Sequence, residues 1–407
     1  MHWLFIHQNA PGQWRALIPA LLKRGHAIHL IGARSRSDGP KGIHYLHYDW
    51  SDQHPAARLV DPDLERNLQR ASRVAALCTQ LSQQGIQPDV VVFHSAWGEG
   101  LYLRDLWPKA VLIAYPELYA QAQLLGHGFD PDAGSLSEGS RRALRRQNFV
   151  ALAAIADSDA AIAPTLFQRD TFPPHLRSRF QVIHEGVDLE QVRPYPRRHL
   201  QLTPDLMLRK GDPVITYVSR SLEPLRGFRV FMRALPAVLE QHPTAQVLIV
   251  GGREGTSYCR ASTHPDGYWG EMLALLGDRL DRSRVHCLGR LPYDQYLAVL
   301  QVSAVHVHLT YPYAMSWSLL EAMACGAVVV GSANAPVDEV IRQGENGYLV
   351  PFSAHDALSN ALLKVLADPA AHAAIGQAAR RTVEQRYGLS AAVEAYEQLA
   401  SSLSLVG

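Results

Sequence analysis

The sequence has few cysteines, almost no net charge and no long hydrophobic run. Its four cysteines, Cys78, Cys259, Cys287 and Cys325, lie far apart among 407 residues, and no two form a C-x-x-C pair. This spacing predicts buried thiols in a reducing compartment and argues against a disulfide framework or a zinc site. The 39 basic and 38 acidic side chains leave a net charge of +1. Because a nucleic-acid-binding protein shows a basic surplus, we expect no nucleic-acid partner.

Targeting and membrane signals are also missing from the sequence. No stretch approaches the roughly 20 apolar residues that a membrane span needs. Residues 1–14 have no charged segment before their apolar run, so we expect them to begin a strand and not a signal peptide. There is no internal repeat and no low-complexity tract. These observations predict a soluble, cytoplasmic protein.

What the sequence does contain is a series of short apolar runs separated by amphipathic stretches. Its 47% hydrophobic and 19% charged residues are typical of a globular protein, and its length suits two domains. Near-continuous apolar runs between helices predict parallel sheets that are covered on both faces. The expected strands are 3–7, 28–31, 89–93, 111–114 and 161–164 in the first half, and 214–218, 246–250, 285–288, 305–308 and 327–330 in the second.

Prolines and charged residues cluster between these two series, at 192–212, and predict a linker. We therefore expect an N-terminal domain at 1–192, a linker at 193–212, a C-terminal domain at 213–385 and a final helix at 386–407 that packs back toward the N-terminal domain. The predicted fold class is α/β, with two doubly wound parallel sheets facing a central cleft. In such folds ligands bind outside the carboxyl ends of the strands.

The most informative stretch is 305–331, in which a strand, a polar and aromatic loop and a helix follow one another. The helix is expected to begin near Ser316, and the free N–H groups of its first turn suit a phosphate. Glu321 lies about one and a half turns into an otherwise apolar helix, where a carboxylate needs a partner. A ribose diol and a structural salt bridge are both compatible with this position.

A second element is the segment 218–227, which runs from the end of a strand into the start of a helix. Arg220 and Arg226 stand six residues apart in it, at the carboxyl edge of the predicted sheet. Two guanidinium groups placed there can bind one diphosphate, whereas the alternative is solvated surface charge.

With these motifs the sequence resembles retaining glycosyltransferases of family 4, the glycosyl transferases group 1, over nearly the whole chain. That resemblance implies the GT-B fold of two Rossmann-like domains, an acceptor-side N-terminal domain and a nucleotide-sugar-binding C-terminal domain. It is carried by several short motifs in their order along the chain: the Pro11-Gly12 loop, His94 after a buried strand, 186–188, Arg220 with Arg226-Gly227, Gly251-Gly252, Gly289-Arg290, 318–326, 336–339 and Asn346-Gly347.

The resemblance also implies residue roles. Arg220 and Arg226 would hold the donor diphosphate and stabilise the leaving group, although family members usually have Arg and Lys one residue closer together. Glu321 would bind the ribose, and His94 would lie by the reacting face of the sugar, with a buried core histidine as the alternative. The other expected donor-binding residues are Gly12, Gly251, Gly252, Arg290, Leu291, Tyr313, Ser316, Trp317 and Ser318, and the acceptor-side residues are Glu99 and Glu117.

The sequence departs from the family pattern at Tyr313. Members of this type carry a Glu eight residues before the ribose-binding Glu, and here that position is a tyrosine. Because the unperturbed pKa of tyrosine is about 10, its phenol carries no charge at neutral pH. We predict that Tyr313 shapes donor preference and is neither a catalytic acid nor a catalytic base.

The implied reaction is sugar transfer with retention from a nucleotide-sugar substrate such as a UDP- or GDP-sugar. Two arginines and a helix start can stabilise the departing diphosphate, so neither a metal nor a separate cofactor is expected. The acceptor would be a glycan, a lipid-linked sugar or a small molecule. One alternative is a nucleotide-sugar epimerase on the same fold, and another is a non-enzymatic two-domain sugar-binding protein. A nicotinamide-dependent oxidoreductase is disfavoured because no G-x-G-x-x-G follows the first strand.

Three Asp-x-Asp patterns raise the alternative of a metal-dependent transferase with a single sheet. They are Asp61-Pro-Asp63, Asp130-Pro-Asp132 and Asp157-Ser-Asp159, and we interpret all three as turns and caps.

Four arginines precede an apolar run in one helical stretch: Arg141, Arg142, Arg145 and Arg146. They indicate either a solvated helix face or a peripheral contact with the inner face of a membrane.

Overall fold

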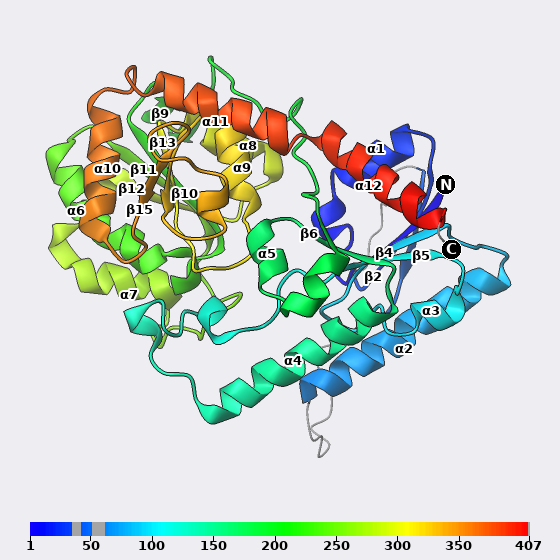
Figure 1. The fold of residues 1–407 in the computed structure, drawn as a ribbon. Helices are drawn as coiled ribbons and strands as arrows, with labels where there is room; N and C mark the ends of the chain where they lie inside the picture. The colour runs from blue at the N-terminus through cyan, green and yellow to red at the C-terminus, as the bar shows by residue number, and fades with distance from the viewer. Residues whose placement is uncertain (35–41, 51–61, 406–407) are drawn as a thin grey trace. The chain divides into compact units, whose positions relative to one another are not determined.

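The computed structural model describes residues 1–34, 42–50 and 62–405, which form two units (Figure 1). Unit 1 comprises Met1–Gln121, Leu136–Gly186 and Leu389–Gly407, and unit 2 comprises Ala122–Ser135 and Val187–Gly388. The segment Ala122–Ser135 therefore belongs to unit 2, although unit 1 flanks it on both sides along the chain.

Unit 1 is built on a seven-stranded sheet whose order is β3-β2-β1-β4-β5-β6-β7. Every neighbouring pair is parallel. Successive strands are added on one side of β1 and then on the other, so the direction of winding reverses between β1 and β4. Such a reversal opens a crevice at the carboxyl ends of the strands. The strands are β1 (His2–Ile6), β2 (Ala27–Gly32), β3 (Ile43–His47), β4 (Val90–His94), β5 (Val111–Tyr115), β6 (Ala160–Ala163) and β7 (Phe180–Val182).

Both faces of this sheet are covered, because successive residues of its central strands are apolar and point to opposite faces. Trp3 and Phe5 of β1 pack in one buried cluster with residues of α1 and α12, whereas Leu4 and Ile6 pack in another with residues of α2. Figure 1 shows α12, the last helix of the chain, beside α1, the first, and the two helices are in contact. The helices of unit 1 are α1 (Leu17–Lys23), α2 (Pro62–Gln83), α3 (Leu103–Leu106), α4 (Glu138–Asp157), α5 (Leu166–Asp170) and α12 (Leu389–Ser404), with 3-10 turns η1 (Gly12–Trp14) and η4 (Pro174–Arg179).

Unit 2 repeats this plan with a six-stranded parallel sheet of order β12-β11-β10-β13-β14-β15. The winding reverses between β10 and β13. Its strands are β10 (Val214–Ser221), β11 (Gln246–Gly252), β12 (Val285–Gly289), β13 (Val305–His308), β14 (Val328–Ser332) and β15 (Tyr348–Val350). Its helices are α6 (Phe228–Gln241), α7 (Gly267–Leu276), α8 (Tyr293–Val302), α9 (Trp317–Ala324), α10 (His355–Ala367) and α11 (Ala373–Arg386), and its 3-10 turns are η2 (Ala122–Leu125), η3 (Pro131–Ala133), η5 (Pro224–Arg226), η6 (Gly277–Arg279), η7 (Arg282–Arg284) and η8 (Val337–Glu339).

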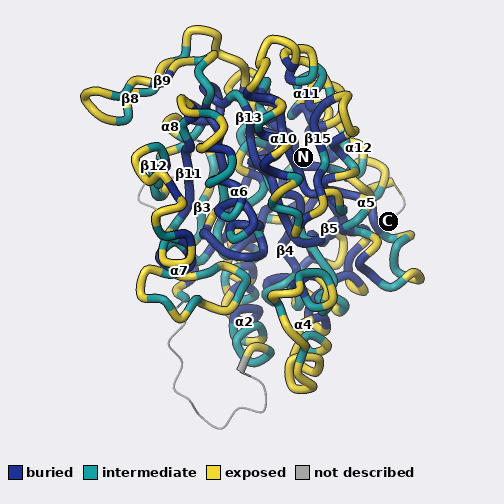
Figure 2. Tube along the Cα trace, turned by 90° about the vertical axis from the view of Figure 1, so that its left-hand side faces the viewer, coloured by how far each residue is buried: buried dark blue, intermediate teal, exposed yellow. Residues whose placement is uncertain are grey.

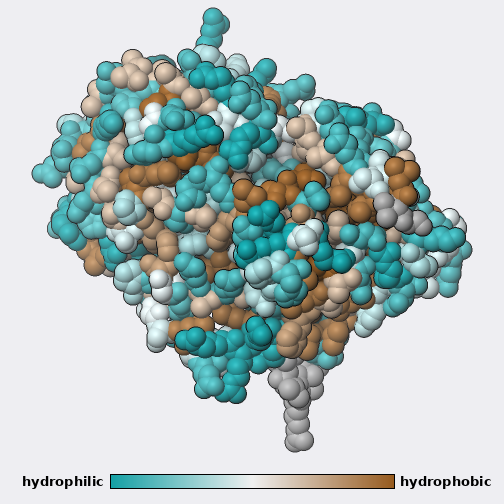
Figure 3. All heavy atoms as spheres, viewed as in Figure 1, coloured by the Kyte–Doolittle hydropathy of each residue, from teal (hydrophilic) through white to brown (hydrophobic). Residues whose placement is uncertain are grey.

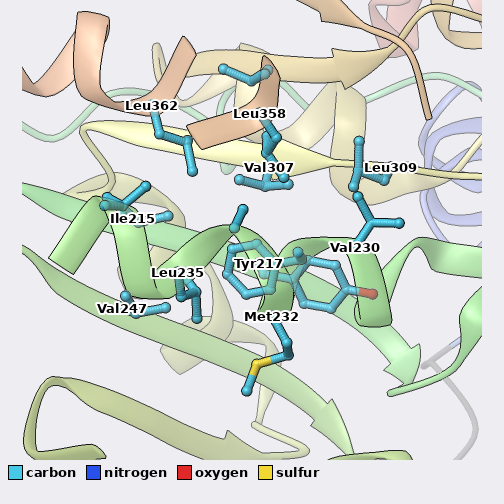
Figure 4. Packing of buried hydrophobic residues seen from close by; sticks show 14 of the residues in the cluster. Ile215, Tyr217, Val230, Met232, Leu235, Val247, Val307, Leu309, Leu358 and Leu362 are labelled. Atoms are coloured by element: carbon cyan, nitrogen blue, oxygen red, sulfur yellow. The ribbon is translucent and has the colours of Figure 1, made fainter. Parts of the chain in front are cut away.

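One buried cluster of unit 2 lies between the sheet and helices α6 and α10, and another includes residues of α8, α9 and α11. Ile215 and Tyr217 of β10 point into the first cluster from one side, and Leu235 of α6 and Leu362 of α10 close it (Figure 4). Each of these four side chains is almost fully buried. Truncating one such leucine to alanine removes about 2–5 kcal/mol of stability, so the helices are held firmly on the sheet. Figure 2 shows dark, buried strands in the interior and lighter, exposed loops at the surface.

The segment 193–212, which the sequence predicts to be a linker, belongs to unit 2. This segment contains an antiparallel hairpin of β8 (His199–Thr203) and β9 (Leu206–Arg209). Its side chains alternate between exposed and half-buried, and only Leu208 is buried, so no continuous apolar run marked it.

Candidate functional site

The carboxyl edge of unit 2, where β10 and β13 end, brings Arg226 against the loop 309–316. The Nη1 atom of Arg226 donates to Oγ1 of Thr310 at 2.9 Å and to the carbonyl of Ala314 at 3.4 Å. Gly227, with φ of 68°, permits this turn, because a Cβ there would lie 2.4 Å from Cβ of Leu309. A half-buried guanidinium is thus fixed at the point where the sheet's winding reverses.

Arg220 lies at the same edge of the sheet but beside other residues. Its side chain is exposed, and its carbonyl lies 3.4 Å from the position a Cβ on Gly252 would take. The Nε atom of Arg290 lies 3.0 Å from that same position, and a Cβ on Gly251 would lie 2.6 Å from the carbonyl of Ser219. The two glycines therefore let the ends of β10, β11 and β12 approach closely and bring Arg220 and Arg290 to one place.

Glu321 is buried in α9, with 3% of its surface exposed. Its carboxylate accepts hydrogen bonds from the hydroxyls of Tyr293 at 2.7 Å and Tyr296 at 2.5 Å, both on α8. Burial and the charge of Glu321 raise the pKa of Tyr296 well above its ordinary value, so this phenol keeps the proton that it donates. A carboxylate oxygen can accept more than one hydrogen bond.

The start of α9 carries three of the expected donor-binding residues. Ser316 is its N-cap but makes no side-chain bond to the helix backbone, and its Oγ instead lies 2.9 Å from Oγ of Ser318. Trp317, the first helical residue, is half-buried. The positive end of this helix therefore carries two hydroxyls and no acidic residue in its first turn.

Tyr313 packs between an aromatic ring and a cation. Its ring centroid lies 4.9 Å from that of Tyr258, and the guanidinium carbon of Arg226 lies 5.8 Å from it. Tyr258 belongs to a loop that is held by the buried Glu223, whose Oε2 accepts the backbone N–H groups of Ser257, Tyr258 and Cys259 at 3.0–3.1 Å.

Sequence reasoning assigned no role to Glu223, Tyr293 or Tyr296. A glutamate followed by proline directly after a strand is as compatible with the start of a helix as with a side chain that caps a distant loop. Only the folded chain shows which amides Glu223 binds, because they lie at least 34 residues away.

The carboxyl edge of unit 1 gathers His7, His94 and Glu117, which stand at or just after the ends of β1, β4 and β5. The ring of His94 is fully buried and stacks on Trp97, with centroids 3.9 Å apart and planes at 12°. The ring of His7 meets it edge-on at 5.1 Å. Gly12, with φ of 56°, lies against His7, and a Cβ there would lie 2.5 Å from the His7 ring. Gly12 and His94 therefore flank one imidazole.

The two expected acceptor-side carboxylates differ in exposure. The Glu117 side chain is 29% exposed, and its Oε2 lies 3.4 Å from Nε2 of His94. Glu99 is 1% exposed and accepts a hydrogen bond from the hydroxyl of Tyr48 at 3.2 Å. Burial raises the pKa of Glu99, while Arg70 and His94 oppose that rise. Glu99 thus lies beneath the edge, whereas Glu117 lies at it.

One of the Asp-x-Asp patterns forms a cap, and a second makes its contacts with distant residues. Asp130 accepts the N–H of Asp132 at 2.9 Å as the cap of η3, and Asp159 accepts from Arg104 and from the N–H of Leu112, both at 2.8 Å. Asp61 lies outside the described residues, and Asp63 stands in the first turn of α2. Within the described ranges, no three His, Cys, Asp or Glu side chains come together as metal ligands. Nor does any helix in these ranges have the length and apolarity to cross a membrane.

Comparison with known proteins gives the same pattern for both halves of the chain. Residues 24–192 match a family described as "Glycosyl transferase family 4 group", and residues 202–382 match "Glycosyl transferases group 1". A D-inositol 3-phosphate glycosyltransferase from Rhodococcus opacus is 28% identical over 70% of this chain and 60% of its own length. Its counterpart in Mycobacterium avium is 31% identical over 50% of this chain and 44% of its own. The chain thus spans about 60% or less of these two relatives.

Solved structures share the fold over the whole chain. Sucrose-phosphate synthase from Thermosynechococcus elongatus superposes with a TM-score of 0.74 at 19% identity and covers 100% of both chains. HepE from Anabaena, solved with UDP and glucose, gives a TM-score of 0.70 at 17% identity and covers 98% of this chain and 99% of its own. Together with the two consecutive family matches, these likenesses show that the chain belongs to the group 1 glycosyltransferases of the family 4 type, with the GT-B fold.

Proposed function

We propose that the protein transfers a sugar from a nucleoside-diphosphate donor to an acceptor hydroxyl. Its family membership supports the reaction class. The observation that carries the proposal is Arg226, a half-buried cation bonded to Thr310 at 2.9 Å where the winding of the unit 2 sheet reverses. A guanidinium fixed there is preorganised for a diphosphate, because its side chain is already ordered in the folded protein and loses little conformational entropy on binding.

The donor residues are assigned around this cation. Arg220 and Arg226 would hold the diphosphate, and the carboxylate of Glu321 would accept hydrogen bonds from the ribose. The backbone at Arg290 and Leu291 would meet the base. Gly251, Gly252, Tyr313, Ser316, Trp317 and Ser318 complete the proposed donor surface.

We propose UDP as the first nucleotide to test, since HepE was solved with UDP and glucose and with UDP-glucose. Departure of a nucleoside diphosphate builds negative charge, which two guanidinium groups and the start of α9 can stabilise. On this account transfer proceeds with retention and without a divalent metal. No further cofactor is required.

Unit 1 is proposed to supply Gly12 and His94 to the transferred sugar and Glu117 to the acceptor side, with the buried Glu99 as support. The acceptor is proposed to be a glycan, a lipid-linked sugar or a small molecule. Because several relatives are named for D-inositol 3-phosphate, a phosphorylated cyclitol belongs in the acceptor panel.

We also propose a cytoplasmic location with peripheral contact to an anionic membrane through α4. Arg141, Arg142 and Arg145 are exposed on this helix, and Phe149, one to two turns further, is 51% exposed. In Figure 3, seen as in Figure 1, hydrophilic atoms cover the start of α4 and apolar atoms lie further along. Such a face suits anionic headgroups and the acyl boundary. Sedimentation with anionic and with neutral vesicles tests it, and equal binding of wild type and the Arg141→Ser/Arg145→Ser variant would contradict it.

The function is tested by a donor screen. Purified protein is incubated with UDP-, GDP- and ADP-sugars and the acceptor panel, and release of the nucleoside diphosphate is scored. We expect release with one donor class that falls in Arg226→Ala. The matched control is Arg381→Ala, which removes an exposed arginine of α11 far along the chain from the donor motifs. No release with any donor, or equal release by all three proteins, would contradict the proposal.

A further inference from the structure

The turn after β5 holds Glu117 in an unusual backbone conformation. Its φ is 61°, and it is the one residue other than glycine with positive φ in the described ranges. The N–H of Leu118 donates to the carbonyl of Pro116 at 2.7 Å, which closes a three-residue γ-turn around Glu117. A γ-turn with positive φ at its centre is rare and strained. A side chain other than glycine persists in such a place only when its surroundings impose it.

The surroundings of this turn do impose it. Nε2 of the buried Gln168, on α5, donates to the carbonyl of Glu117 at 3.1 Å. The next two residues are bonded as well, since Tyr119 N–H donates to Oγ1 of Thr171 at 3.0 Å and Ala120 N–H donates to Oδ1 of Asn148 at 2.7 Å. The turn is therefore fixed by α4 and α5, and its effect is to direct the Glu117 carboxylate toward the end of β4.

At the end of β4 the carboxylate meets His94, whose protonation pattern can be inferred from its contacts. Nδ1 of His94 accepts the N–H of Ala96 at 3.3 Å, so it carries no proton in this arrangement. The ring proton of the neutral imidazole then lies on Nε2, 3.4 Å from Oε2 of Glu117. Within the described part of the chain this buried Nε2 makes no hydrogen bond. The Glu117 carboxylate beside it favours the proton on Nε2.

We propose that Glu117 is a positioning residue that keeps His94 in its Nε2–H tautomer, so that His94 serves the transfer as a hydrogen-bond donor and not as a general base. The inference rests on the proposed function for its role in transfer, but not for the tautomer. The strain at Glu117 is then a consequence of function, because glycine would relieve the backbone and lose the carboxylate.

Two measurements on the full chain test this proposal. The first needs no substrate and records the ¹⁵N NMR signals of the protein with labelled histidine. The signals of His94 are assigned as those that disappear in His94→Gln. We expect the Nε2–H tautomer in the wild type and a shift toward a mixture in Glu117→Gly. A wild-type His94 protonated at Nδ1, or identical spectra for the two proteins, would overturn the proposal even if the protein is an active transferase.

The second measurement compares stability with activity. Glycine accepts a positive φ and alanine does not, so Tm of Glu117→Gly should lie about 2–4 °C above that of Glu117→Ala and no lower than that of the wild type. Its kcat/KM should nevertheless fall roughly 10- to 100-fold, as expected for a misplaced group at a reacting centre. In a His94→Gln background the same change should have no further effect. Full activity of Glu117→Gly, or an equal loss in both backgrounds, would contradict the proposal. Absence of turnover in the wild type would instead refute the proposed function and leave the tautomer result to decide this inference.

Discussion

Replacing Glu321 separates a structural role from a ligand-binding one, because its carboxylate already has two phenol partners. Each hydrogen bond to a charged group contributes about 1.5–3 kcal/mol. Glu321→Ala removes the shared acceptor of Tyr293 and Tyr296, and it should lower the free energy of unfolding by about 3 kcal/mol or more. Tyr296→Phe removes only one of these bonds and should lower it by about 1.5–3 kcal/mol. Thermal and denaturant unfolding of the three proteins measure this part.

The ligand role requires a probe that stability does not affect. We compare a ribonucleoside diphosphate with its 2′-deoxy analogue by calorimetry, in the wild type and in both variants. If Glu321 binds the ribose, the wild type should prefer the ribonucleotide by about 10-fold or more, the effect of one charged hydrogen bond. Tyr296→Phe should keep that preference, since the carboxylate remains, and Glu321→Ala should lose it. Equal affinities in the wild type, or an undiminished preference in Glu321→Ala, would refute the ribose assignment and leave Glu321 with a structural role alone.

Four further results are expected. Arg220→Ala and Arg226→Ala should each lose about 1.5–3 kcal/mol of transition-state stabilisation, measured as kcat/KM, and unchanged values would reject the diphosphate assignment. Exhaustive chelation should leave transfer intact, and a loss restored by manganese would contradict metal independence. Tyr313→Phe should cost at most about 1.5 kcal/mol, whereas Tyr313→Ala should cost more because the contact with Tyr258 is lost. Burial lowers the pKa of His306 to about 3. In the unfolded chain the pKa of this histidine is about 6.5, so between pH 6.5 and pH 3 the unfolded chain binds one proton more than the folded chain. The free energy of unfolding should therefore fall by about 2 kcal/mol from pH 7 to pH 5. In His306→Gln the fall in Tm should be smaller, and an equal fall would exclude His306 as its cause.

The parallel strands could be predicted from the sequence because they are buried on both faces. Residues 90–93 and 327–330 are apolar without interruption, and the structure places β4 and β14 there. Helix α6 begins at Phe228, where the segment 218–227 predicts the start of a helix. Arg226 could be recognised as a candidate ligand-binding residue because it follows the end of a strand by a few residues. In a parallel sheet the carboxyl ends of all strands lie at one edge, so the strand direction alone places Arg226 there.

Other features depend on contacts between distant residues and left no local pattern. No local pattern marks Ala122–Ser135 as part of unit 2, where the hydroxyl of Tyr311 donates to Oδ2 of Asp130 at 2.5 Å. The phenol partners of Glu321 lie 25 and 28 residues before it on another helix. The turn at Glu117 is set by bonds from α4 and α5, and its sequence contains no glycine that would have indicated a positive φ.

The central claim is that the protein moves a sugar from a nucleoside diphosphate at the edge that carries Arg226. The most direct test is mass spectrometry of the acceptor after incubation with the donor selected by the screen, for the wild type and for Arg226→Ala at equal folded concentration. We predict an acceptor that gains the mass of one sugar residue together with one equivalent of released nucleoside diphosphate, at a rate reduced by roughly 10-fold or more in the variant. Diphosphate release without a heavier acceptor, or equal product from both proteins, would contradict the account.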